Sequence, residues 1–138
     1  MTSELRGQLV TFHLRTDSGV PPYLQLVQQI RQAVRAGVLE VGDRLPTVKE
    51  VVAELAINPN TVQKAYRELE HEGLVEGRQG VGTFVASRPQ GPPPEAQARL
   101  ARSLHKWVDS ARAQGMDDEA MESLLRDTLR TAQGTRIA

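Results

Sequence analysis

The sequence lacks cysteine altogether among its 138 residues, and it lacks any long apolar run. Without cysteine there is no disulfide framework and no thiolate metal site, which suits a reducing compartment. No segment reaches the roughly 20 apolar residues that a membrane-spanning helix requires, and the charged, mixed start has no signal-peptide pattern. We therefore expect a cytoplasmic protein with no membrane partner.

A net charge is also absent, because 17 lysines and arginines balance 17 aspartates and glutamates. Such a chain has no overall field to draw it to nucleic acid, so a nucleic-acid partner must be met by a local patch. The length allows a compact domain with a short appendage and excludes a large two-lobed enzyme. We find no nucleophile–base pair, metal-ligand cluster or cofactor motif, so we predict no catalytic residue, no metal and no cofactor.

Apolar residues at helical spacing predict three helices in the first half of the chain. The first begins at Pro22, which suits a first turn, and stops at Gly37. The second is short and follows Thr47, which has the capping-box spacing to Glu50. The third follows Asn58, because an asparagine before a proline makes a good N-cap.

A β-hairpin is predicted after the third helix, with strands at Leu74 to Glu76 and Thr83 to Ala86 around a glycine-bearing loop. The loop does not match a nucleotide site, because a strand rather than a helix follows it and neither phosphate-binding spacing is present. Its glycines either serve the turn alone or let the loop also contact a partner, since Arg78 and Gln79 give it polar reach.

Residues 87–94 contain four prolines and no apolar residue other than these, which is typical of an extended spacer. We predict a domain at 1–88, a linker at 89–94 and a helical tail at 95–138. The tail has two apolar stripes that two such helices cannot enclose alone, so they must pack on the first domain or on a second copy. The only tryptophan is interpreted as an anchor of that contact rather than a ligand-stacking residue. The predicted dimer interface comprises Leu100, Leu104, Trp107, Val108, Met121, Leu124 and Leu125.

The third helix has a polar tip that its own stability does not explain. Between Ile57 and Arg67 it has two basic residues and no acidic one, whereas three glutamates crowd its far end, against the helix dipole. Its outer arc carries Asn60, Gln63 and Lys64. Asparagine and glutamine pair with adenine, and lysine reaches guanine or phosphate. Together with the order of helices and hairpin, this predicts a mainly α winged helix-turn-helix followed by a two-helix dimerisation hairpin.

Four stretches also resemble the GntR family of bacterial transcription regulators: "LPT", "NPNTV", "AYRELEHEGLV" and "GVGTFV". The similarity extends from Pro21 to Val85. The short tail and "SGVPPYLQL" resemble the YtrA-type branch, whose tail is a dimerisation unit. The resemblance implies a homodimeric repressor that binds an inverted repeat in double-stranded DNA upstream of its own operon, often one that encodes an ABC transporter.

By position, the resemblance implies that the start of the second helix contacts phosphate or a base edge, the third helix enters the major groove, and the hairpin loop lies at the minor groove. The full predicted DNA-binding set is Thr47, Lys49, Asn58, Asn60, Thr61, Gln63, Lys64, Arg67, Arg78, Gln79, Gly80 and Gly82. Many family members have arginine where this chain has Lys49, Pro59 and Gln63. We therefore expect more A·T contacts there.

Two further alternatives stay open at the level of sequence. A winged helix also serves as a protein-interaction module, in which case the polar tip is merely solvated, and the neutral charge balance favours that alternative. Any small-molecule effector is expected where the tail's apolar stripes meet the first helix and the partner subunit.

Overall fold

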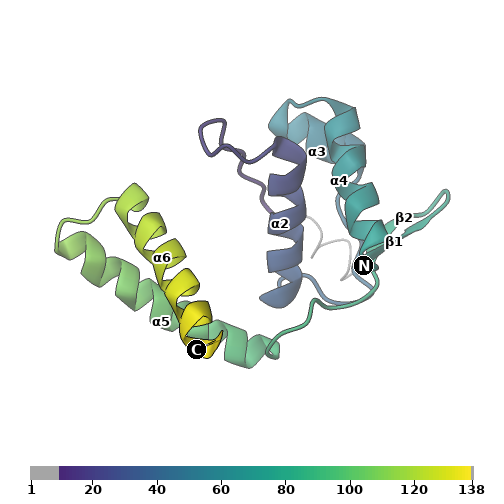
Figure 1. Cartoon of the computed structure of the whole chain (residues 1–138). Coiled ribbons are helices and arrows are strands. Elements are labelled where there is room, and N and C mark those ends of the chain that lie inside the picture. Colours follow the sequence, from purple (N-terminus) through teal and green to yellow (C-terminus); the bar gives the residue numbers. More distant parts are fainter. Residues whose placement is uncertain (1–9, 138) are drawn as a thin grey trace. The chain divides into compact units, whose positions relative to one another are not determined.

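The structure, a computed structural model, describes residues 10–137. These residues form five helices and one two-stranded antiparallel sheet (Figure 1). They divide into two compact units, one that ends at Gln97 and one that begins at Ala98. The predicted mainly helical fold with a small hairpin is confirmed.

The first unit is built on helices α2 (Pro22–Arg35), α3 (Val48–Leu55) and α4 (Pro59–His71), with α4 in contact with both of the others (Figure 1). Apolar stripes on these helices, predicted from the sequence, meet in one core. Its completely buried members are Leu26, Val27, Ile30, Val34, Leu39, Val62, Ala65 and Leu69. Each large one contributes roughly 1.5–3 kcal/mol by leaving water, so this core holds α4 in place.

Both predicted helix caps are present. The Thr47 hydroxyl accepts a hydrogen bond from the Glu50 N–H, and the Glu50 carboxylate accepts one from the Thr47 N–H, each at 3.1 Å. The Asn58 side chain accepts from the Asn60 N–H at 2.8 Å, as the N-cap of α4. Between the two helices Ala56 adopts a left-handed conformation with φ of 53°, which costs an alanine roughly 1–2 kcal/mol. The tight turn sets the angle between α3 and α4.

The hairpin consists of β1 (Val75–Arg78) and β2 (Gly82–Val85). Its strand ends differ from the predicted ones by one or two residues, because the antiparallel register continues until Arg78 pairs with Gly82. The loop is therefore shorter than predicted. Gly80, in the middle of that loop, has φ of 76°, a conformation that a side chain disfavours.

The second unit is a helical hairpin of α6 (Asp118–Ile137) and the part of α5 (Pro94–Ala113) from Ala98 onward, as the two stripes predicted. The break between them contains Gly115 with φ of 97°. None of the helices in the described part of the chain is long and apolar enough to cross a membrane.

Candidate nucleic-acid interface

The outer face of α4 carries a polar surface, which we call the reading face: Asn60, Thr61, Gln63, Lys64 and Arg67. All of these side chains are exposed except that of Thr61, which is partly buried. The opposite side of the same helix is buried in the core through Val62, Ala65, Tyr66 and Leu69. Because the core holds α4 from Val62 to Leu69, the helix backbone beneath the reading face is held in place.

Lys64 is not an unconstrained charge on this face. Its ammonium lies 4.1 Å from the centre of the Tyr23 ring, near the start of α2. Such a cation–π contact is worth roughly 0.5–1 kcal/mol at an exposed site, so it orients the lysine while leaving N–H groups for an acceptor. No sequence pattern indicates this contact, because Tyr23 lies 41 positions earlier and has an unremarkable place in its helix.

The start of α3 is fixed against α4 by a buried tyrosine. The Tyr66 hydroxyl donates to the Pro46 carbonyl at 2.6 Å, and burial raises the pKa of Tyr66, so the hydroxyl stays a donor. This bond holds the segment that leads into the Thr47 cap. Thr47 and Lys49, predicted to contact DNA, are both exposed beside it.

The wing, which we define as the hairpin loop with the adjoining residue of each strand (residues 78–82), presents Arg78, Gln79 and Gly80 to solvent. The Arg78 guanidinium lies 4.4 Å from the centre of the Phe84 ring, so its side chain runs along the hairpin. Gly82 has φ of 141°, and a Cβ there would lie 3.1 Å from the Arg44 side chain. The turn and the close approach of Arg44 therefore both favour a glycine at position 82, apart from any contact with a partner.

Two shallow hollows connect these parts. One, of about 540 Å³, lies between Thr47 and the hairpin from Gly77 to Thr83. The other, of about 220 Å³, is bordered by Gln63, Arg67 and again Thr83. The start of α3, the reading face and the wing thus border one continuous surface of the first unit. The structure brings the predicted DNA-binding residues of all three elements together.

Two of the three glutamates at the end of α4 have specific partners, although both are exposed. Glu72 forms an ion pair with Arg31 of α2. The Glu70 carboxylate accepts a hydrogen bond from the Gly77 N–H of β1 at 2.8 Å. Arg31 lies 41 positions before Glu72, and Gly77 lies seven positions after Glu70 in a different element. Helical spacing and charge patterns therefore indicate neither partner.

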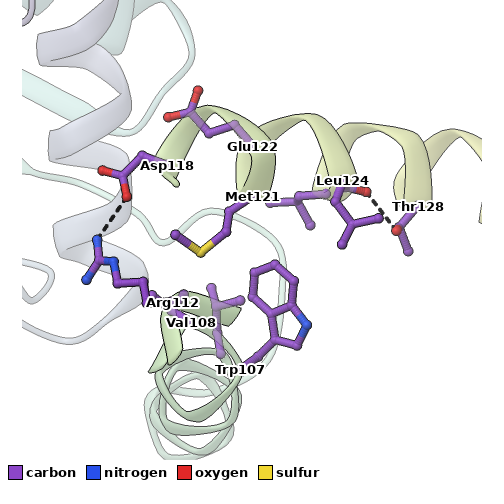
Figure 2. A pocket seen from close by; sticks show the side chains of 10 residues that line it. Trp107, Val108, Arg112, Asp118, Met121, Glu122, Leu124 and Thr128 are labelled. Atoms are coloured by element: carbon purple, nitrogen blue, oxygen red, sulfur yellow. Dashed lines mark hydrogen bonds and ion pairs between the residues drawn. The ribbon is translucent and has the colours of Figure 1, made fainter. Parts of the chain in front are cut away.

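In the second unit, apolar side chains of α5 and α6 line a cavity of about 460 Å³ (Figure 2). Trp107 and Met121 face it from opposite helices, and at one end Arg112 pairs with Asp118 at 3.0 Å. Met121 is buried within one chain, whereas several predicted interface residues are well exposed: Leu100, Leu104, Trp107, Leu124 and Leu125. The cavity is lined by the tail alone.

Residues 22–85 match the family described as "Bacterial regulatory proteins, gntR family". The chain is also 30% identical over 118 residues to the HTH-type transcriptional repressor YtrA of Bacillus subtilis (strain 168), over 85% of this chain and 91% of that protein. This chain belongs to the GntR family.

Two more similarities are informative about this GntR-family chain. It is 41% identical over 105 residues to the HTH-type transcriptional regulator Rv1152 of Mycobacterium tuberculosis (strain ATCC 25618 / H37Rv), over 75% of this chain and 83% of the relative. The AraR DNA-binding domain, solved in complex with operator ORX1, is 26% identical and covers 56% of this chain and 96% of its own, with a TM-score of 0.50. The first unit is thus a winged helix of the kind found in GntR-family regulators.

Proposed function

We propose that this GntR-family chain is a sequence-specific DNA-binding transcription regulator. It binds an inverted-repeat operator as a homodimer and represses its own operon, with a linked ABC transporter among the regulated genes. The observation that carries the proposal is the single surface on which the acid-free reading face of α4, the start of α3 and the wing meet. Similarity to relatives named as transcriptional regulators and repressors supports it.

Each part of this surface has a suitable contact with a B-form duplex. Asn60 and Gln63 are exposed on one side of α4 and suit the edges of adenine in the major groove. Lys49 lies in the first turn of α3, where its ammonium and the free N–H groups of the helix suit phosphate. Gly80 has no side chain, so the wing's backbone can approach a minor groove closely.

The tail supports a homodimer because its apolar surface is too exposed for an isolated chain. Leu100, Leu104 and Leu125 are 62%, 52% and 47% exposed in one chain. Burying apolar surface releases roughly 25 cal/mol per Å², and two tails bury such surface against each other. A two-fold dimer presents its two reading faces to two half-sites of opposite orientation.

The experiment that tests the proposal is selection of binding sites from a random DNA pool by the purified full chain, at near-physiological salt to suppress nonspecific phosphate attraction. An enriched inverted repeat, with A·T pairs at the positions contacted by α4, is the expected result. A pool that shows no enrichment, with or without added cell extract to supply an effector, would contradict it and would favour the protein-interaction module.

A further inference from the structure

The two edges of the hairpin are held in different ways. The outer edge of β2 is bonded to the backbone of the segment before α3: Gly42 N–H to Val85 carbonyl, Val85 N–H to Asp43 carbonyl and Leu45 N–H to Thr83 carbonyl, each at 2.8 Å. These bonds continue the sheet with main-chain partners. The backbone polar groups on the outer edge of β1 need other hydrogen-bond partners.

The N–H of Gly77 points out from that edge. Leu74 and Ala86 form a hydrogen-bonded pair, because the Ala86 N–H donates to the Leu74 carbonyl. In an antiparallel ladder bonded and non-bonded pairs alternate, so the Gly77–Thr83 pair is non-bonded and the Gly77 N–H faces away from β2. The Glu70 carboxylate of α4 accepts this N–H at 2.8 Å.

The hydrogen bond to Glu70, rather than an unusual backbone conformation, explains the glycine at position 77. Gly77 is not among the described glycines with positive φ, so its backbone conformation is open to other residues. A Cβ built at this position would lie 2.8 Å from the carboxylate Oε2 of Glu70, closer than real Cβ contacts come. The missing side chain makes room for the carboxylate.

Glu70 also borders the surface proposed to meet DNA. It lines the same hollow as Gln63, Arg67 and Thr83, one helical turn beyond the reading face. Its bond therefore joins α4 to β1 where the two halves of that surface meet. We propose that Glu70 is a positioning residue that holds the wing at a fixed angle to the reading face, an inference that rests on the proposed DNA-binding function.

A pair of variants separates the bond from the charge. Glu70→Gln removes the negative charge but retains a side-chain oxygen that accepts the Gly77 N–H, whereas Glu70→Ala removes both. Loss of a carboxylate near phosphate by itself strengthens DNA binding, so the comparison that matters is between the two variants. Glu68→Gln and Glu68→Ala are the matched controls, since Glu68 is exposed on the same helix two residues earlier.

The first readout is hydrogen exchange of the Gly77 amide in the free full-length protein, which requires no DNA. We expect this amide to exchange about fivefold faster in Glu70→Ala than in wild type, with rescue in Glu70→Gln. The amides of Glu76 and Arg78, which lie in bonded pairs inside the hairpin, should be unchanged. Equal Gly77 exchange in all three proteins would overturn the inference whether or not the protein binds DNA.

The second readout is affinity for the DNA sequence that the random pool enriches. Glu70→Ala should bind it roughly three- to tenfold more weakly than Glu70→Gln, while the two Glu68 variants bind alike. Equal affinities for the two Glu70 variants would overturn the positioning role. If wild type enriches no sequence, the proposed function fails instead, and the exchange result still stands separately.

A double-mutant cycle provides the last arm. Gly77→Ala places a methyl 2.8 Å from the Glu70 Oε2, so the carboxylate has to shift and the same bond should weaken from the other side. Its effect on exchange at position 77 and on affinity should therefore largely vanish in the Glu70→Ala background. Additive effects would contradict a shared bond.

Discussion

The two units of the chain use apolar residues in opposite ways. In the first, residues such as Leu26, Ile30 and Leu69 are completely removed from solvent within a single chain. In the second, only Ala111 and Met121 of the described residues are buried, whereas Leu100 and Leu129 are 62% and 59% exposed. Both units have amphipathic helices, so the pattern of apolar residues is similar and the degree of enclosure differs.

That difference follows from the number of elements. Three helices and a hairpin surround a common centre, and α4 has a neighbour on two sides. Two helices in a hairpin bury only the side chains that lie between them, and the other apolar residues of each stripe stay exposed. In our proposal the complete core of the first unit supports the reading face, whereas the apolar residues of the second unit become buried only when a second copy packs against them.

The largest expected effect comes from the enclosed core. Leu69→Ala, at a completely buried position of α4, should lower the free energy of unfolding of the first unit by roughly 2–5 kcal/mol, because it reduces apolar burial and leaves a cavity. Urea unfolding monitored by circular dichroism measures it. Leu100→Ala, at an exposed position of the tail, is the matched change and should leave that unit's stability unchanged; equal decreases would contradict the contrast.

The next effect concerns the exposed stripe of the tail. In the proposed dimer Trp107 is an interface residue, so Trp107→Ala should weaken dimerisation by roughly 2 kcal/mol or more, because a large aromatic in an interface contributes much of its energy. Sedimentation equilibrium over a range of concentrations detects the shift toward monomer. Arg102→Ala is the control, since 100° per residue places Arg102 on the opposite side of α5 from Trp107. A dimer unaffected by the tryptophan change would place the interface elsewhere.

A smaller effect is expected at the reading face, with folding intact. Thr61→Ala combined with Gln63→Ala should weaken binding to the selected DNA by roughly 1–3 kcal/mol for each good interaction with a base that the variant can no longer form. Titration at fixed salt measures the affinity, and a thermal unfolding midpoint close to that of wild type verifies the fold. Binding as tight as that of wild type would mean that another face reads the DNA.

The smallest effect is at the cap of α3. Thr47→Ala should lower stability by about 1 kcal/mol, because the Glu50 N–H then loses its acceptor. Denaturant unfolding at neutral pH measures this decrease. An unchanged midpoint would mean that water replaces the hydroxyl at no cost in stability.

The same cap predicts a dependence on pH. The backbone N–H of Thr47, followed by its hydroxyl, holds the pKa of Glu50 below its ordinary 4.5. The folded state thus favours the carboxylate, so the contribution of Glu50 is present above about pH 4.5 and is lost as pH falls through the lowered value. The stability difference between wild type and Glu50→Ala should therefore shrink in acid. A constant difference across that range would contradict it.

Local signals in the sequence were sufficient for the helices and their caps. Thr47 with Glu50 and Asn58 before Pro59 fix helix starts through bonds within three residues, so the sequence alone contains the information. Strand ends were less accurate, because they depend on the cross-strand register, which extends to Arg78 and Gly82. The domain boundaries and the residues of the dimer interface stay predictions.

The contacts that orient the candidate site were not predictable in the same way. Three contacts join residues from different elements: the cation–π contact of Lys64 with Tyr23, the hydrogen bond of Glu70 with Gly77, and the ion pair of Glu72 with Arg31. The sequence itself shows which end of α4 is free of acids, but it does not show that two of the glutamates at the other end have partners. Such pairs depend on how the elements pack, and no short window of sequence contains that information.

The central claim is that the first unit binds DNA and the second unit joins two copies of the chain. Comparing the affinity of the protein for DNA with one half-site and for DNA with two tests this claim most directly. Wild type and Trp107→Ala are titrated onto the selected inverted repeat and onto a duplex with one half-site replaced. We predict that wild type prefers the full repeat roughly 100-fold or more and that the tail variant loses most of this preference. Equal binding of wild type to both duplexes would contradict the account.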